Sequence, residues 1–303
     1  MIVEFATFGS LGIDDLVFPD GSTMWGVPGG GSMYSAMGMA IWGGRPSVVA
    51  PVGDAYPFEA FRDRIDFSRC PRIDRTMRNW GLYEEDGTRH FTLRSTCRDY
   101  ETFCAAPEAI GDAVFGGVHI SAMPWAIQND VARALRAAGV RHLSIDADDK
   151  YSDRMSRDDI AGLLTLADLF VPSWQDVRNM LPGRSPEDGL RELREIGAGV
   201  PVIAVKMGAE GALLHVAGDD RIVSIPTAAE VVVDVTGAGD AFAGGALLGY
   251  ARTGDAVEAM VRGSVSASFA LAAHGPAALL SATPDEIHRR AAALRGKITA
   301  TPF

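Results

Sequence analysis

The sequence is poor in cysteine and lacks any long uninterrupted apolar segment. Its three cysteines, Cys70, Cys97 and Cys104, are odd in number and show no Cys-x-x-Cys spacing, so neither a disulfide framework nor a zinc site is predicted. The longest apolar stretch, Val265 to Leu280, is interrupted by His-Gly-Pro and falls short of the ~20 residues that span a bilayer. These absences predict a soluble protein of a reducing, cytoplasmic compartment.

The N-terminal segment also lacks the basic residues of a signal peptide, since its first charged residue is Glu4. We therefore expect no export. The chain carries 28 Lys and Arg against 39 Asp and Glu, a net charge of −11, which would repel nucleic acid and anionic membranes. An acidic protein that binds phosphate must build a local positive site from backbone amides, a helix terminus or a bound cation.

Short apolar runs alternate with helical segments along the chain, and no linker or repeat divides it. This alternation predicts a single α/β domain over residues 1–303, with a parallel sheet covered by helices on both faces. The expected strands are Ile2–Phe8, Ser47–Val52, Gly117–Ser121, His142–Asp146, Asp168–Val171, Pro201–Met207 and Val231–Val233, and the expected helices include Tyr34–Trp42, Ala126–Ala138 and Glu187–Ile196.

Two segments depart from this alternation. Residues 16–27 carry a Pro-Asp-Gly turn, and residues 76–94 carry Glu-Asp-Gly between β-rich flanks; both patterns indicate hairpins. We expect them to form a small antiparallel sheet added to the main one. Such a sheet is either surface decoration or a lid over a substrate cleft.

The segment with the clearest chemistry begins at Asp234 and reads Asp-Val-Thr-Gly-Ala-Gly-Asp-Ala-Phe-Ala-Gly-Gly. The backbone amides of Gly237, Ala238 and Gly239 can point into one concavity, and a helix beginning there adds the positive end of its dipole. The glycines let a phosphate approach closely. Asp240 would then accept a proton from an attacking hydroxyl. The alternative is a plain glycine-rich turn whose aspartate only complements the helix dipole.

This segment is similar to the C-terminal signature of the PfkB, or ribokinase-like, carbohydrate kinases. The resemblance implies a three-layer α/β/α sandwich with a small β-lid. It also implies transfer of the ATP γ-phosphate, with Mg²⁺, to a hydroxyl of a small sugar, polyol or sugar acid, with Asp240 as the base. A nucleoside kinase of the same family and a ligand sensor without turnover are the alternatives. Because such lids often pair between subunits, a homodimer is a further expectation.

Two N-terminal segments resemble the acceptor side of that family. The run from Gly9 to Asp14 is similar to the family's first strand, which implies that Asp14 holds substrate hydroxyls, with Asp15 as its rival. The glycine cluster after Pro28 is similar to the N-terminal Gly-Gly signature, where the backbone of Gly29 and Gly30 approaches the substrate. Tyr34 stands where the family has asparagine, so its ring either contacts the substrate or packs on its own helix.

The nucleotide side is implied by a second pair of segments. Val205-Lys-Met-Gly-Ala-Glu-Gly-Ala212 resembles the strand-turn-strand that lines the family's nucleotide site, with backbone room at Gly208 and Gly211. Lys206 either approaches a phosphate or is a solvated residue at a strand end.

Ser173 and Asp176 replace the family's Asn-x-x-Glu, which belongs to the magnesium and phosphate environment. A helix cap explains the same two residues, and the two roles are compatible. Members of the family often hold a monovalent cation such as K⁺ beside the anion hole, which is the concavity of backbone amides at Gly237 to Gly239. The matching positions for this cation are Asp234 and Thr236.

Two other classes of nucleotide-binding protein are disfavoured by what the chain lacks. It has no Gly-x-x-x-x-Gly-Lys-Ser/Thr motif of P-loop kinases. The Gly-Ala-Gly segment also lacks the third glycine of a dinucleotide fingerprint and lies near the C-terminus, which disfavours an oxidoreductase.

Overall fold

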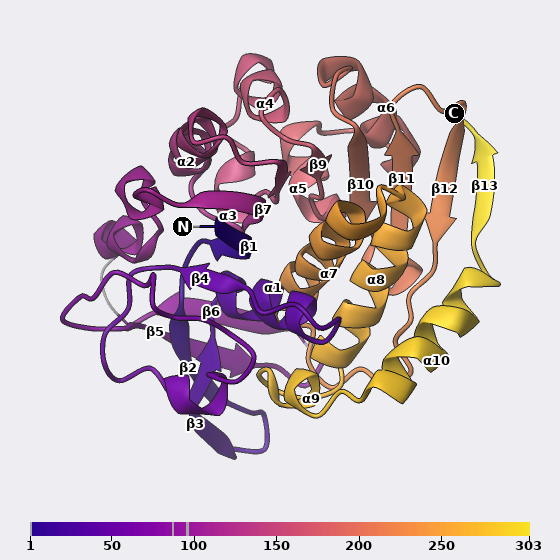
Figure 1. Ribbon diagram of the computed structural model, residues 1–303. Coiled ribbons are helices and arrows are strands. Elements are labelled where there is room, and N and C mark those ends of the chain that lie inside the picture. The colour runs from indigo at the N-terminus through magenta and orange to yellow at the C-terminus, as the bar shows by residue number, and fades with distance from the viewer. Residues whose placement is uncertain (1, 87, 95–96) are drawn as a thin grey trace.

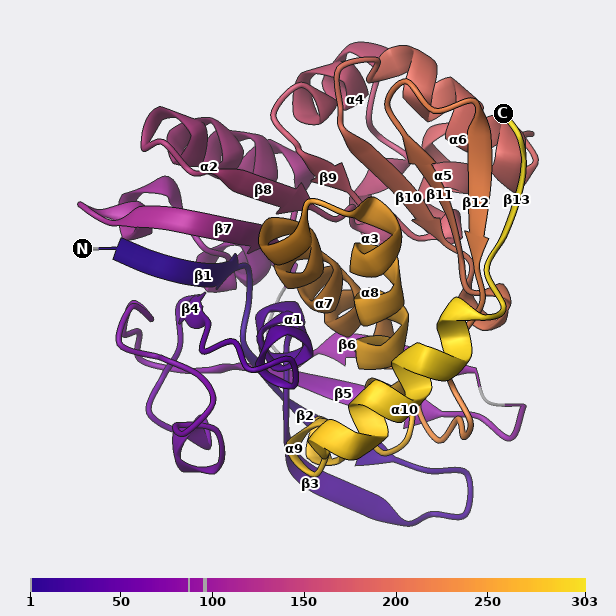
Figure 2. The same ribbon diagram turned by 45° about the vertical axis from the view of Figure 1, so that its right-hand side comes forward.

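The computed structural model describes residues 2–86, 88–94 and 97–303, without the side chains of residues 97–99 and 149. Figures 1 and 2 show a twisted central sheet with helices on both faces and a smaller sheet at one end. None of the described helices combines the length and apolar character needed to cross a membrane. The described thiols of Cys70 and Cys104 are buried and free.

The central sheet joins both ends of the chain. Its strands lie in the order β13-β12-β11-β10-β9-β8-β7-β1-β4. From β4 to β10 neighbours are parallel, and from β10 to β13 they are antiparallel. The strands are β1 (Ile2–Phe8), β4 (Ser47–Val49), β7 (Val114–Ile120), β8 (His142–Ile145), β9 (Leu169–Phe170), β10 (Val202–Lys206), β11 (Ala212–Val216), β12 (Arg221–Ile225) and β13 (Thr299–Pro302).

Helices cover both faces of this sheet, as predicted for an α/β/α sandwich. One face packs against α1 (Gly31–Ala40), α7 (Ala238–Thr253) and α8 (Ala256–Ala270), with α9 (Ala277–Leu280) and α10 (Pro284–Arg295) beyond them. The opposite face packs against α2 (Trp125–Ala137), α4 (Arg157–Leu164), α5 (Trp174–Met180) and α6 (Pro186–Ile196). Shorter turns are α3 (Asp149–Ser152), η1 (Phe58–Ala60), η2 (Cys97–Phe103), η3 (Pro107–Ile110) and η4 (Gly208–Glu210). Among the described residues, each face has its own large buried apolar cluster, and Phe5, Met39, Leu247 and Leu248 form a smaller third one.

The two hairpin-like segments form the smaller sheet, hereafter the lid sheet. Its strands are β2 (Gly12–Val17), β3 (Thr23–Gly29), β5 (Met77–Tyr83) and β6 (Arg89–Leu93), in the order β3-β2-β5-β6. The prediction of an antiparallel sheet is wrong at its centre, where β2 and β5 run parallel. The chain passes through β3, α1 and β4 before β5, and such a crossover returns a strand in the same direction. Gly87 of the predicted Glu-Asp-Gly turn lies outside the described residues, and the homodimer stays a prediction.

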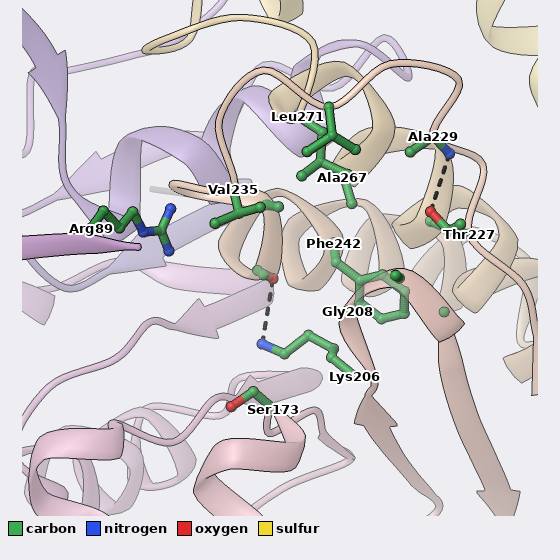
Figure 3. A pocket seen from close by; sticks show the side chains of 16 residues that line it. Arg89, Ser173, Lys206, Gly208, Thr227, Ala229, Val235, Phe242, Ala267 and Leu271 are labelled. Carbon is green, nitrogen blue, oxygen red and sulfur yellow. Dashed lines mark hydrogen bonds between the residues drawn. The ribbon is translucent and has the colours of Figure 1, made fainter. Parts of the chain in front are cut away.

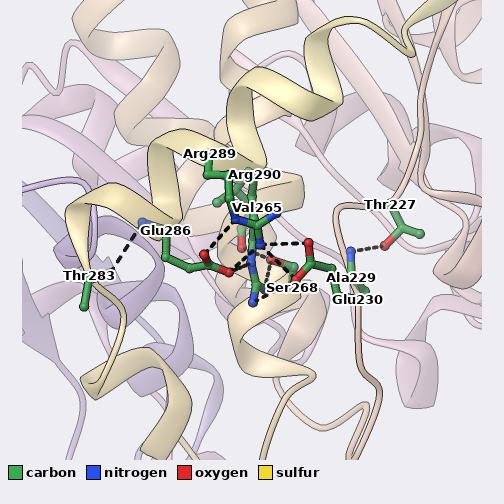
Figure 4. A network of polar contacts seen from close by, with 9 residues as sticks. All are labelled: Thr227, Ala229, Glu230, Val265, Ser268, Thr283, Glu286, Arg289 and Arg290. Carbon is green, nitrogen blue, oxygen red and sulfur yellow. Dashed lines mark hydrogen bonds and ion pairs between the residues drawn. The ribbon is translucent and has the colours of Figure 1, made fainter.

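The predicted strand Val231–Val233 is wrong. These valines form an irregular segment with exposed fractions of 59%, 62% and 47%. Their β-branched side chains favour a strand, but the edge of β12 is already paired with β13. The segment is instead tied to helix α10, where Arg289 binds the carboxylate of Glu230 at 2.8 and 2.9 Å (Figure 4).

Candidate active site

Two cavities meet at the N-terminus of α7. One has a volume of about 480 Å³ and the other about 530 Å³. Ala238 and Gly239 border the first, while Thr236, Gly237 and Asp240 border the second. The glycine-rich loop singled out in the sequence therefore lies between the two chambers.

The loop has the conformation expected of an anion hole. Gly237 has a φ of 73° and directly precedes α7, which begins at Ala238. A side chain at Gly237 would be strained by this φ, and its Cβ would also overlap the ring of Tyr34. A Cβ at Gly239 would meet the Lys206 Nζ at 3.2 Å. The amides at the start of this helix thus lie at its positive end with a cationic side chain beside them.

Asp240 occupies the first turn of α7 and reaches into the second cavity. It lies against the glycine cluster, since a Cβ added at Gly31 would be 2.6 Å from the Asp240 Oδ1. Burial raises the pKa of Asp240 above its ordinary value, and the positive charge of Lys206 opposes that rise. A carboxylate with a raised pKa is a better proton acceptor, which suits a general base.

Lys206 ends β10 and connects the loop to a buried acid. Its Nζ is ion-paired with Asp146 and lies 3.5 Å from the carbonyl oxygen of Gly239. Burial raises the pKa of Asp146 to about 7, against the lowering effect of Lys206. The lysine is largely buried, with 11% of its side chain exposed, so it is not a solvated residue at a strand end. Sequence reasoning missed Asp146, although its place at the carboxyl end of β8 is where ligands bind in such sheets.

Ser173 and Asp176 form a complete capping box at the start of α5. The Ser173 hydroxyl accepts a hydrogen bond of 3.2 Å from the backbone amide of Asp176. The Asp176 carboxylate accepts one of 2.7 Å from the backbone amide of Ser173. This confirms the predicted cap. Ser173 also borders the first cavity. Among the described residues no group of three or more metal-ligating side chains is found, so the magnesium role of Asp176 stays a prediction.

The first cavity has walls of small and apolar residues, shown in Figure 3. Gly208 and Gly211, which the sequence predicts to line the nucleotide site, border this cavity at the turn between β10 and β11. Gly211 has a φ of 90°, and a Cβ there would overlap the carbonyl oxygen of Ile225. Helices α7 and α8 and the irregular segment add the rest of the wall, which includes Val232, Val235, Phe242, Ser264, Ala267 and Leu271.

Asp14 of the lid sheet borders the second cavity. Asp14 lies within β2, not at the end of the first strand, because β1 stops at Phe8 and the chain turns into the lid sheet. Its Oδ1 accepts a hydrogen bond of 2.8 Å from the Asn79 amide on β5. Burial raises the pKa of Asp14 to about 6, although the bond from Asn79 lowers it. The backbone of Gly29 lies against this carboxylate with no room for a Cβ.

Asp15, the rival of Asp14, has a different role. Its carboxylate is ion-paired with Arg78 at 2.7 Å and with Arg94, and its side chain is fully buried. The hydrogen bond from Arg78 is the largest of the effects that lower its pKa to about 2. Asp15 thus holds the strands of the lid sheet together, and Asp14 faces the cavity.

Tyr34 packs and borders the cavity at once. It is buried, with its ring against Gly237, and it lines the second cavity with Gly30. Gly30 has a φ of 97°, and a Cβ there would crowd the backbone of Ser10 and Leu11. The far wall was not predicted, since its residues form no sequence motif; it includes Phe91, Tyr100, Asp148, Lys150 and Tyr151. The rings of Tyr100 and Tyr151 are stacked, with centroids 6.5 Å apart.

Asp234 is surrounded by hydrogen-bond donors. Its Oδ1 accepts the amide and hydroxyl of Thr236 at 2.9 and 2.7 Å and lies 3.3 Å from Arg89 Nη1. Its Oδ2 accepts the Tyr83 hydroxyl at 2.8 Å and lies 3.3 Å from His274 Nδ1. Burial would raise the pKa of Asp234, but the bonds from Thr236 and Tyr83 and the charge of Arg89 together lower it. These donors do not fit a K⁺ ion at Asp234. They already occupy the lone pairs of the carboxylate, and one of the donors, Arg89, is itself a cation.

The match to a family model, made over most of the chain, defines the class of protein as a kinase. Residues 14–283 match the model of the pfkB family carbohydrate kinases. The chain belongs to this family, and the ribokinase-like fold predicted from the sequence is confirmed.

The chain is similar to kinases of different substrates. It is 27% identical to a cytidine kinase of Thermococcus kodakarensis, over 86% of this chain and 93% of that protein. It is 30% identical to a 2-dehydro-3-deoxygluconokinase of Dickeya dadantii, over 57% of this chain and 59% of that protein. A putative ribokinase II of E. coli, solved with ATP and Mg²⁺, has the same fold, with a TM-score of 0.75, 20% identity and coverage of 95% of this chain and 98% of that chain.

Proposed function

We propose that this protein transfers the γ-phosphate of ATP to a hydroxyl of a small sugar-like substrate. The observation that carries the proposal is the position of Asp240, in the first turn of α7 at the junction of the two cavities. ATP with Mg²⁺ would occupy the first cavity, with its γ-phosphate against the amides of Gly237 to Gly239. Lys206 would contribute positive charge there, and the acceptor would lie in the second cavity.

The chain's own groups divide the chemical work between them. Asp240 takes the proton from the acceptor hydroxyl as its oxygen attacks phosphorus, so the proton ends on the carboxylate and the ester bond forms as the bond to ADP breaks. The helix amides stabilise charge on the transferring phosphate. Bound Mg²⁺ would neutralise charge on the ATP phosphates, and Asp176 would reach it through bound water.

Asp14 and Asn79 would select the acceptor. A carboxylate offers acceptor lone pairs and an amide adds donors, so together they can bind neighbouring hydroxyls of a sugar, polyol or sugar acid. The glycine cluster lets the substrate lie close to the backbone between Asp14 and Asp240.

A nucleoside is the second candidate acceptor. The observation that favours it is the aromatic wall of Phe91, Tyr100 and Tyr151, because aromatic rings stack on planar bases. The similarity to a cytidine kinase over most of both chains supports the same candidate.

The test is ADP release from ATP and Mg²⁺ in the presence of sugars, polyols, sugar acids or nucleosides, with product isolation. We expect one acceptor class to give one phosphoester per ADP. Release of ADP with no phosphorylated acceptor would point to a hydrolase. If a ligand stabilises the protein but no acceptor supports turnover, the chain is a ligand sensor and the proposal is wrong.

A further inference from the structure

Arg89 of the lid sheet places a positive charge beside the first cavity, the proposed nucleotide side. Arg89 and Tyr83 are cross-strand neighbours on β6 and β5, and both reach the segment that precedes the anion hole. Arg89 Nη1 donates to the Thr236 hydroxyl at 2.7 Å and lies 3.3 Å from the Asp234 carboxylate. This contact is not predictable from the sequence, because residues 89 and 234 are far apart in the chain.

The guanidinium is not used up by these two contacts. Arg89 keeps 28% of its side chain exposed and borders the first cavity. Figure 3 shows it pointing toward the cavity beside Val235, across from Lys206. An arginine has five N–H donors, so those not directed at Thr236 and Asp234 remain available to face a phosphate.

We infer that Arg89 supplies, from the lid, the positive charge that a monovalent cation would otherwise supply beside the anion hole. The guanidinium lies where an ion bound to Asp234 and Thr236 would have to lie, and the two cations would repel each other there. The kinase should therefore bind its nucleotide without K⁺. This inference rests on the proposed kinase function.

The test measures binding of ATP with Mg²⁺ by calorimetry, without acceptor, in about 100 mM KCl or in choline chloride of equal ionic strength. Wild-type affinity should change less than about twofold between the salts. Arg89→Ala should lose about tenfold or more in choline, the worth of a charged hydrogen bond, and recover several-fold in KCl because K⁺ can enter the vacated site. Arg89→Lys should stay close to the wild type in both salts.

Arg94→Ala is the matched control. It also removes a lid arginine paired with an aspartate, but Asp15 retains Arg78 and Arg94 does not border the first cavity. Its nucleotide affinity should be unchanged in both salts.

Three outcomes would overturn the inference: wild-type binding that needs K⁺, Arg89→Ala that binds like the wild type, or a loss in Arg89→Ala that K⁺ does not restore. The wild-type comparison holds even if Arg89→Ala fails to fold. A wild type that binds no ATP in either salt would instead refute the proposed function.

Discussion

The two cavities of the site are built by different means. The first cavity, the proposed nucleotide side, uses backbone amides, glycines and apolar walls, with Lys206 as its buried cation. The second cavity, the proposed acceptor side, uses side chains from several elements, with Asp14, Asn79 and Asp240 directed into it. Backbone sites depend on local conformation and side-chain sites depend on tertiary contacts. Substitutions on the two sides should therefore fail in different ways.

The nucleotide side should break most severely at Gly237. Gly237→Ala places a side chain at positive φ and against the ring of Tyr34, so the loop must rearrange. We expect kcat/KM for ATP to fall roughly 10²-fold, as when an oxyanion donor is lost. Gly239→Ala is the matched control, because its Cβ would meet only the flexible end of Lys206 at 3.2 Å; it should lose less than about tenfold. Equal losses in two folded variants would contradict the predicted backbone constraint.

The acceptor side should respond to pH through Asp14. Its raised pKa of about 6 means that the carboxylate is protonated below that pH and loses an acceptor lone pair. We expect kcat/KM for the acceptor to fall about tenfold per pH unit below 6. Asp14→Asn should lower kcat/KM for the acceptor at neutral pH by about 10- to 100-fold. It should also remove the contribution of this carboxylate to the fall in kcat/KM at acidic pH.

The KM for ATP provides the internal control for this profile, because Asp14 does not border the nucleotide cavity. If Asp14→Asn keeps wild-type acceptor kinetics across the pH range, Asp14 is a structural residue of the lid.

The smallest expected effect distinguishes two roles of Ser173, which caps α5 and borders the first cavity. Ser156 and Asp159 form the same capping box on α4, and Ser156 does not border the nucleotide cavity. Ser173→Ala and Ser156→Ala should each lower the free energy of unfolding by about 1 kcal/mol, measured by urea denaturation. Only Ser173→Ala should also raise the KM for ATP with Mg²⁺, by roughly twofold to threefold, the lower end of a hydrogen bond's worth. A KM unchanged in both variants would leave Ser173 as a cap alone.

The same difference explains what the sequence could predict. The anion hole, the glycine turn at Gly208 and the capping box at Ser173 lie on contiguous segments, so their geometry is set by neighbouring residues. Asn79 and Arg89 reach the site only because the lid sheet pairs β2 with β5 and β5 with β6. The sequence predicts Asp14 for the acceptor site but places it at the end of the first strand, whereas it lies within β2, because the short turn from β1 into β2 leaves no composition change.

The incorrectly predicted strand at Val231–Val233 also depends on tertiary contacts, which in this case prevent a strand from forming. Its β propensity is local, but strand formation needs a free neighbouring edge, and β13 from the C-terminal end already pairs with β12. Of the three exposed valines, Val232 borders the first cavity instead.

The most direct test is a single-turnover measurement on Asp240→Asn, with the acceptor that the ADP-release test identifies. The amide keeps the volume of the carboxylate but cannot take the proton. We expect phosphoester formation to slow by roughly 10²-fold or more, with nucleotide and acceptor dissociation constants little changed and folding intact. If the folded variant forms phosphoester at the wild-type rate, Asp240 is not the base and the proposed mechanism is wrong.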